Sequence, residues 1–232
     1  ESAENYKENP FYPYFEERIR PQIESHVDRH IGISLCYLNQ ALVSFALAGW
    51  IRDHFPEKCL VMGGGLISSW MSRPDYRNPF SGLIDICVHG EGEAQLVEIL
   101  GKKPKKKRHF VPDYDFVDKT SYLSPGLILP FRASIGCYWS KCRFCPEAAE
   151  TRPYCSQRAA NVLRDLREVE NRYQPRMVHL IDNAVTPAFL KAMSKEQFSF
   201  DWYGFVRFEK DLTDPEFCRN LKQSGCAMLK LG

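Results

Sequence analysis

The feature that most constrains the fold is a regular alternation of short apolar runs with amphipathic segments, which begins near residue 31. In the first half of the chain, apolar runs with the length of buried strands lie at residues 31–35, 59–62 and 83–88. Between the first two runs, apolar residues recur at the spacing of one helix face: Val43, Ala46, Leu47, Trp50 and Ile51. Strands that are joined by helices run parallel, so this half predicts an α/β fold with a partial doubly wound, Rossmann-like sheet.

The alternation returns after residue 126 and continues to the end of the sequence. A helix is expected from the apolar face within residues 159–169. Helix starts are expected at Thr186-Pro187 and at Thr213, which forms a capping box with Glu216, and Gly225 fits a helix stop. Strands are expected at residues 127–135, 177–181, 202–208 and 227–231. This half therefore predicts a second parallel sheet.

Residues 101–126 separate the two halves and have the composition of a linker. They include a basic run at residues 102–108, which resembles a nuclear localisation signal or a nucleic-acid patch. A solvated, self-repelling connector explains the same run, and we favour that interpretation. The expected organisation is a first domain at residues 1–100, a linker at 101–126 and a second domain at 127–232.

The strongest chemical signal is a cluster of three cysteines within nine residues, Cys137, Cys142 and Cys145, in a predicted loop between a strand and a helix. Thiolates on one short loop can bind a soft metal ion or an iron–sulfur cluster. A structural zinc or a ferredoxin cluster takes four protein ligands, whereas three thiolates leave one iron of a [4Fe-4S] cluster open. Cys155 is a candidate fourth ligand, and with it the loop would form a closed zinc site.

The stretch from Gly136 to Cys145, Gly-Cys-Tyr-Trp-Ser-Lys-Cys-Arg-Phe-Cys, resembles the cluster loop of radical S-adenosylmethionine (SAM) enzymes, in the form of their cobalamin-binding branch. The second gap and its aromatic residue match the family pattern, but the first gap, residues 138–141, is one residue longer. The resemblance implies an incomplete radical SAM (β/α) partial barrel of the TIM type at residues 127–232. It also implies that the chain is a piece of a longer protein.

The resemblance further implies a role for several side chains. Phe144 would pack against the adenine of SAM, Asp182 would accept the methionine ammonium, and Arg207 would face the methionine carboxylate. A helix-capping aspartate and an arginine paired with a barrel acid are the alternatives for the last two residues. Three irons of a [4Fe-4S] cluster would be bound by Cys137, Cys142 and Cys145.

A second, weaker signature lies at the ends of the first two predicted strands. Ser34 and the pair Gly63-Gly64 resemble the serine and double-glycine motif of cobalamin-binding domains, which implies contact with the nucleotide tail of cobalamin. A Rossmann-like sheet without cobalamin is the open alternative. The Gly-x-Gly-x-x-Gly fingerprint is absent, which counts against a nicotinamide cofactor.

The family chemistry is reductive cleavage of SAM to a 5'-deoxyadenosyl radical, combined in this branch with cobalamin-dependent methyl transfer or rearrangement. The implied partners are an unknown substrate and an electron donor such as flavodoxin or ferredoxin. Two alternatives from other classes stay open: a cobalamin-binding carrier module without radical chemistry, and a zinc-stabilised interaction protein.

Composition excludes several classes of protein for this chain. The net charge of +2 predicts no dedicated nucleic-acid surface, and no apolar run approaches the roughly 20 residues of a membrane span. Nine cysteines are too sparse and too unevenly spaced for a disulfide framework, which predicts a reducing, cytoplasmic location. The six histidines form no helical ligand pair, and each is expected to be structural.

Overall fold

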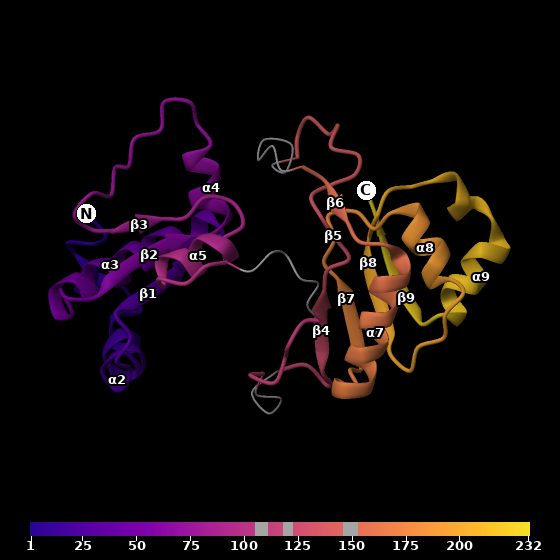
Figure 1. The fold of residues 1–232 in the computed structure, drawn as a ribbon, viewed down its shortest axis with the longest axis horizontal. Coiled ribbons are helices and arrows are strands. Elements are labelled where there is room, and N and C mark those ends of the chain that lie inside the picture. The colour runs from indigo at the N-terminus through magenta and orange to yellow at the C-terminus, as the bar shows by residue number, and fades with distance from the viewer. Residues whose placement is uncertain (105–110, 118–122, 146–152) are drawn as a thin grey trace. The chain divides into compact units, whose positions relative to one another are not determined.

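The computed structural model describes residues 1–104, 111–117, 123–145 and 153–232. The chain divides into two compact units, Glu1–Lys106 (unit 1) and Lys107–Gly232 (unit 2), as Figure 1 shows. Each unit has its own hydrophobic core. The division falls within residues 101–126, the stretch that composition identifies as a linker.

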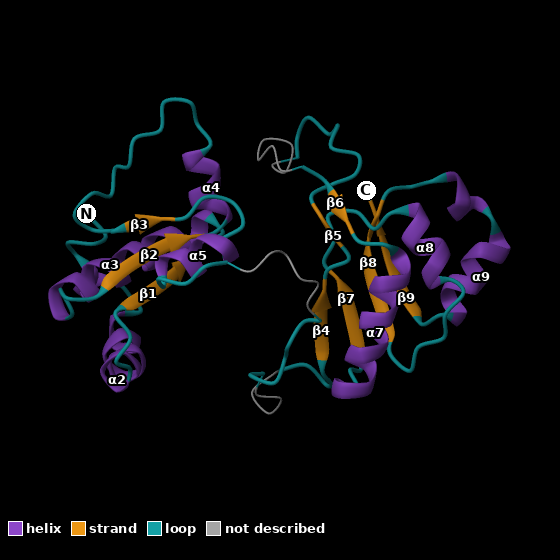
Figure 2. Ribbon diagram, in the orientation of Figure 1, coloured by secondary structure: helices purple, strands orange, loops and turns teal. Residues whose placement is uncertain are grey.

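Unit 1 contains a three-stranded parallel sheet in the order β1-β2-β3, drawn in orange in Figure 2. Its strands are β1 (His30–Ser34), β2 (Cys59–Gly63) and β3 (Ile86–Cys87). The helices that follow the strands are α3 (Ala41–His54), α4 (Gly65–Met71) and α5 (Glu93–Ile99). The predicted alternation of parallel strands and helices is confirmed, although β3 is shorter than the strand expected at residues 83–88.

Asp85 explains why β3 is short. The backbone N–H of Leu60 donates to Asp85 Oδ2 at 2.7 Å, and the guanidinium of Arg52 pairs with the same oxygen. The Asp85 carboxylate therefore accepts the Leu60 N–H, which a backbone carbonyl of β3 would accept if the strand were longer. Regular pairing with β2 therefore begins only at Ile86.

The core of unit 1 lies between α3 and the sheet. Trp50 and Ile51 of α3 and Leu60 and Met62 of β2 belong to one cluster and have no exposed surface. Burial of one such side chain stabilises a fold by about 1.5–3 kcal/mol. The helix face predicted from the spacing of apolar residues is therefore the face that is buried.

The first residues of unit 1 form a short 3-10 turn, η1 (Tyr6–Glu8), followed by a helical segment that combines α-helical and π-helical turns. The segment consists of α1 (Tyr12–Tyr14), the π-helical turn η2 (Phe15–Ile19) and α2 (Arg20–Ser25). Pro21 lies in the first turn of α2, and the helical segment continues without a break from η2 into α2 although Pro21 has no N–H to donate.

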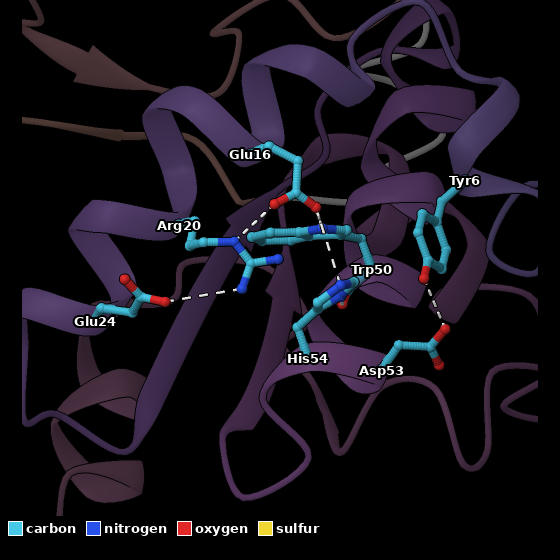
Figure 3. Close-up of polar contacts among 7 residues, drawn as sticks. All are labelled: Tyr6, Glu16, Arg20, Glu24, Trp50, Asp53 and His54. Carbon is cyan, nitrogen blue, oxygen red and sulfur yellow. Dashed lines mark hydrogen bonds and ion pairs between the residues drawn. The ribbon is translucent and has the colours of Figure 1, made fainter.

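Glu16 joins this helical segment to α3, as Figure 3 shows. Its carboxylate accepts hydrogen bonds from Arg20 Nε and from Trp50 Nε1, both at 2.7 Å. The guanidinium of Arg20 also lies 5.2 Å from the centre of the Trp50 ring. One carboxylate therefore links the two helices through a cation and an indole.

Unit 2 contains a four-stranded parallel sheet in the order β4-β7-β8-β9. Its strands are β4 (Ile128–Phe131), β7 (Met177–Leu180), β8 (Asp201–Val206) and β9 (Cys226–Leu231). Its helices are α7 (Ala159–Tyr173), α8 (Pro187–Met193) and α9 (Pro215–Gln223), with a 3-10 turn, η4 (Lys210–Thr213), before α9. Figure 2 shows the strands side by side with these helices packed on them.

One face of this sheet carries the core of unit 2. Buried strand residues such as Val178, Leu180 and Trp202 pack with Leu166 of α7 and Leu190 of α8. Strand residues with the opposite orientation stay partly exposed. The helices therefore cover one face of the sheet, as expected for parallel β/α units.

Two predictions for unit 2, one strand boundary and one helix N-cap, are wrong. The strand expected at residues 127–135 is two strands, β4 and the short β5 (Ser134–Ile135), and β5 pairs antiparallel with β6 (Cys155–Ser156). The N-cap of α9 is Asp214, which accepts the N–H of Glu216 at 2.9 Å, and not the predicted Thr213. The predicted N-cap at Thr186 is confirmed, since its hydroxyl accepts the N–H of Phe189.

The segment at residues 111–117, part of the expected linker, packs on unit 2 through Tyr114. This side chain is 8% exposed, its hydroxyl donates to the carbonyl of Pro130, and its N–H donates to the Tyr173 hydroxyl at 3.0 Å. Residues 105–108 of the basic run lie outside the described residues. Among the helices that are described, none combines the length and the apolar character that crossing a bilayer requires.

Candidate functional site

The cysteine loop begins directly after β5 and is shaped by two residues in the left-handed region. Gly136 has φ 72° and Ser140 has φ 47°. The N–H of Cys145 donates to the carbonyl of Cys142 at 3.2 Å, so these two cysteines belong to one turn. The loop therefore has local order between its cysteines.

The thiols of this loop have the chemistry of metal ligands. Cys137, Cys142 and Cys145 are all free and partly exposed. Within the described residues, however, no three His, Cys, Asp or Glu side chains are gathered closely enough to hold a metal ion. The donor types fit an iron–sulfur cluster or zinc, and binding would require the three thiols to move together.

Phe144 lies inside the loop, and its side chain is 90% exposed. It is free to contact a ligand, which is compatible with the predicted position beside adenine. Cys155, the candidate fourth thiol, lies opposite Ile135 in the β5–β6 pair and is also exposed. The pairing places Cys155, which follows the cysteine loop, beside Ile135, which precedes the loop.

Asp182 follows β7 and is 3% exposed. Its Oδ2 accepts the N–H of Ala133 at 3.0 Å, and its Oδ1 accepts the Ser134 hydroxyl at 2.5 Å. Burial raises the pKa of this carboxyl above its ordinary value of 3.8, against the lowering effect of these hydrogen bonds. Asp182 therefore holds the break between β4 and β5, from which the cysteine loop starts.

Arg207 lies one residue beyond β8 and contacts the cysteine loop. Its guanidinium is 3.5 Å from the centre of the Trp139 ring, and its Nη1 pairs with Glu209 Oε1 at 3.0 Å. The same carboxylate oxygen accepts the Tyr138 hydroxyl at 3.0 Å. The pKa of Tyr138 is raised, first by burial and then by the hydrogen bond to Glu209.

No role was predicted for Tyr138, Trp139 and Glu209. The sequence does contain one signal for such a contact, because Tyr138 and Trp139 lie side by side between two of the clustered cysteines. Large aromatic side chains in a short loop usually pack against other residues. Their partner Arg207 is separated from them by several secondary-structure elements, so spacing alone could not identify the contact.

In unit 1, Ser34, Gly63 and Gly64 come together at the carboxyl ends of β1 and β2. Ser34 is the register partner of Gly63. Gly64 has φ 104°, and a Cβ at this position would lie 2.5 Å from the carbonyl oxygen of Leu35. Backbone conformation and close packing therefore require glycine at position 64. A Cβ at Gly63 would meet only an ordinary 3.4 Å contact with Val88. Packing therefore explains the second glycine and not the first.

Cys36 was not singled out from the sequence, and it lies beside these residues. Its Sγ is 3.5 Å from the Ser34 hydroxyl oxygen, and the thiol is exposed. The hydrogen bond from Ser34, and then the backbone N–H of Gly65, lower the pKa of this thiol. His89 lies just beyond the carboxyl end of β3. Its Nε2 is 3.0 Å from the hydroxyl oxygen of Ser72, in the loop that follows α4.

The fold resembles that of a cobalamin-dependent radical SAM enzyme. A similar solved structure is that of the apo, selenomethionine-labelled cobalamin-dependent S-adenosylmethionine radical enzyme OxsB, with a TM-score of 0.59 and 14% sequence identity. The match covers 94% of this chain and 37% of the OxsB chain, so this chain spans little more than a third of that protein. At this identity the likeness establishes the fold alone. No protein-family model matches the sequence, and no curated protein matches it.

Proposed function

We propose that this chain is part of a radical SAM enzyme of the cobalamin-dependent kind. The observation that carries the proposal is the loop of three free cysteines, Cys137, Cys142 and Cys145, which follows β4, the first strand of the parallel β/α sheet, and the short β5. Ligand sites in such sheets lie at this edge. The fold shared with a cobalamin-dependent radical SAM enzyme supports the same assignment.

In this proposal Cys137, Cys142 and Cys145 would hold a [4Fe-4S] cluster through their thiolates, which would leave one iron without a protein ligand and open to SAM. When bound, these cofactors supply reductive cleavage of SAM, and the protein positions them and excludes water. Phe144 is proposed to cover the adenine, and Asp182 is the proposed acceptor for the methionine ammonium. A donor protein such as flavodoxin or ferredoxin would supply the electron for this cleavage to the cluster.

Cobalamin is proposed to bind at the carboxyl edge of the unit 1 sheet. Ser34 and Gly63 are register partners there, and the packing of unit 1 does not account for the glycine at position 63. A bare backbone allows a bulky ligand to approach closely. The Ser34 hydroxyl supplies a hydrogen-bonding group at the same place.

The cluster proposal is tested by anaerobic reconstitution with iron and sulfide, followed by counting both elements per chain. About four irons per chain are expected for a single [4Fe-4S] cluster. Cys142→Ala should lose them, whereas Cys218→Ala, an exposed thiol of α9, should not. Iron that binds equally to both variants would reject the loop as the cluster site.

The cobalamin proposal is tested separately by equilibrium dialysis against hydroxocobalamin. Gly63→Val should weaken binding at least tenfold, because the added side chain occupies the approach to the strand end. The matched control is Gly32→Val in β1, where an added Cβ would meet no atom within 4 Å. Equal binding by both variants would contradict the proposed position.

A zinc site is the second candidate for the cysteine loop, because the β5–β6 pair brings Cys155 opposite Ile135. It predicts one zinc per chain and a loss of zinc on Cys155→Ala. The radical SAM proposal predicts instead that Cys155→Ala keeps its iron. The two candidates are therefore separated by one variant.

A further inference from the structure

Two cations lie against the ring of Trp139 in the cysteine loop. The guanidinium carbon of Arg207 is 3.5 Å from the ring centre, and Lys141 Nζ is 4.7 Å from it. The Trp139 side chain is 36% exposed, so solvent screens the contact only in part. Arg207 belongs to the chain after β8, so this contact joins the loop to another part of the sheet edge.

The neighbouring residue of the loop is held by the same group. Tyr138 donates its hydroxyl hydrogen to Glu209 Oε1, and Arg207 Nη1 pairs with that same oxygen, each at 3.0 Å. The Arg207 and Glu209 side chains are 27% and 31% exposed, so the ion pair is partly shielded from water. Two successive loop residues are thus fixed by one charged pair.

This contact falls within the segment between Cys137 and Cys142. Among the described residues, Tyr138 of that segment also lies edge-on to Tyr154, with the ring centres 6.3 Å apart. The segment contains Ser140, whose φ of 47° is strained for a residue with a side chain. A segment of this kind has several available conformations unless outside contacts select one. The spacing of the first two thiols therefore depends on how Tyr138 and Trp139 are held.

We infer that Arg207 and Glu209 are positioning residues, which fix the first inter-cysteine segment and thereby the separation of Cys137 and Cys142. The inference rests on the proposed function for its importance, because that function gives these thiols a cluster to bind. It assigns Arg207 a different task from the contact with the SAM carboxylate that the sequence resemblance implies. The contacts themselves exist without any cofactor.

The experiment measures thiol alkylation in the metal-free, full-length protein, with each cysteine quantified by mass spectrometry. Arg207→Ala should raise the alkylation rates of Cys137 and Cys142 about fivefold, the equivalent of one cation–π contact of about 1 kcal/mol. Cys218, in α9, is an internal reference whose rate should stay constant. Arg207→Lys retains a cation near Trp139 and should restore part of the protection.

The matched control is Arg172→Ala. Arg172 also pairs with carboxylates, those of Asp113 and Asp115, and lies 5.0 Å from an aromatic ring centre, that of Tyr173, but its contacts do not include the cysteine loop. Its loss should leave the rates of Cys137 and Cys142 unchanged. Circular dichroism of every variant checks that the fold is retained.

A second variant keeps the inference testable if Arg207→Ala unfolds. Tyr138→Phe removes only the hydrogen bond to Glu209 and should raise the two rates about twofold to fivefold. Unchanged rates in a folded Arg207→Ala or Tyr138→Phe variant would overturn the inference, as would an equal increase in Arg172→Ala. None of these results depends on iron, so they can fail or succeed independently of the cluster proposal.

A further readout applies to the reconstituted protein. If Arg207 positions the loop, Arg207→Ala should lower the iron retained per chain after gel filtration, and Arg207→Lys should recover it. If Arg207 instead binds SAM, both variants should retain iron and lose only the spectral response to SAM. The second pattern would overturn the positioning role.

Discussion

Glu16 is a carboxylate that links the first helical segment to α3, through hydrogen bonds from Arg20 and Trp50. The hydrogen bond from Arg20 is the largest cause of its pKa shift, and together with the Trp50 indole it lowers the pKa of Glu16 from 4.5 to about 2, against the opposing effect of burial. The folded state therefore favours the ionised form more strongly than the unfolded chain does. The charge of one residue helps to attach the first helical segment to α3.

Glu16→Gln keeps the side-chain shape and removes the charge. At pH 7 the free energy of unfolding of unit 1 should fall by about 1–2 kcal/mol, because a charge-assisted hydrogen bond is replaced by neutral ones. The contribution of a lowered pKa is present above the unfolded value of 4.5 and is lost as the pH falls toward about 2. Urea denaturation at pH 7 and pH 3 should therefore show a smaller difference between the two proteins at pH 3.

Glu24→Gln is the matched control for Glu16. Glu24 also pairs with Arg20, but at 3.8 Å and with 55% of its side chain exposed, so its removal should change stability little. A Glu16→Gln effect that is equal at both pH values, or equal to that of Glu24→Gln, would contradict the role of the Glu16 charge.

His179 is a residue whose replacement should stabilise unit 2. Its ring stacks on Tyr203 at 4.2 Å, and its Nε2 is buried without a hydrogen-bond partner. Burial, and then the charge of Lys230, lower the pKa of His179 below 6.5. The folded state therefore resists protonation, and stability is lost as the pH falls from above 6.5 through the folded pKa.

His179→Phe keeps an aromatic ring against Tyr203 and removes the unpaired nitrogen. The free energy of unfolding of unit 2 should rise by about 1 kcal/mol at pH 8, and by more at pH 5, where the unfolded wild-type chain is protonated at this position. Urea denaturation at the two pH values measures both effects. A variant that is less stable than wild type at pH 5 would contradict the assignment of His179 as an unsatisfied buried base.

At the scale of elements, Asp182 determines where the first strand of unit 2 ends and where the cysteine loop begins. Asp182→Ala should lower the free energy of unfolding of unit 2 by about 2–3 kcal/mol, because the Ala133 N–H and the Ser134 hydroxyl lose a buried acceptor. Asp182→Asn should be close to wild type, since an amide can accept from the first and donate to the second. Thermal unfolding by circular dichroism would show the contrast, and equal losses in both variants would contradict it.

Most helices and parallel strands of this chain could be predicted from periodicity, because apolar faces are encoded within each segment. The apolar face of α3 was predicted in this way, and its residues lie in or against the core of unit 1. The break between β4 and β5 could not be predicted, because it depends on Asp182, which is 49 positions from Ala133 in sequence. A contact between distant residues leaves no periodic trace in either segment.

The candidate site shows the same limit. The close spacing of the three cysteines identifies them as candidate metal ligands in the sequence, and all three lie on one loop of the structure. The stacking of Arg207 on Trp139 depends on the arrangement of β8 and the loop in space, and the sequence showed only an arginine near the end of an expected strand. Contacts that position a loop were therefore missed, whereas the groups that bind a metal could be proposed.

At the scale of the whole molecule, the two units have separate cores, one of residues in unit 1 and one of residues in unit 2. Separate cores allow separate cooperative transitions. Calorimetry should resolve two unfolding steps, with Glu16→Gln shifting one and Asp182→Ala shifting the other. A single transition that both variants move equally would contradict two independently cooperative units.

The proposed function requires the cysteine loop to bind a [4Fe-4S] cluster in which one iron has no protein ligand. The most direct test is EPR spectroscopy of the anaerobically reconstituted and reduced protein, recorded before and after SAM is added. A reduced [4Fe-4S] signal that changes shape with SAM, is absent in Cys142→Ala and persists in Cys218→Ala is the expected result. One tightly bound zinc per chain with no EPR signal would contradict the radical SAM assignment.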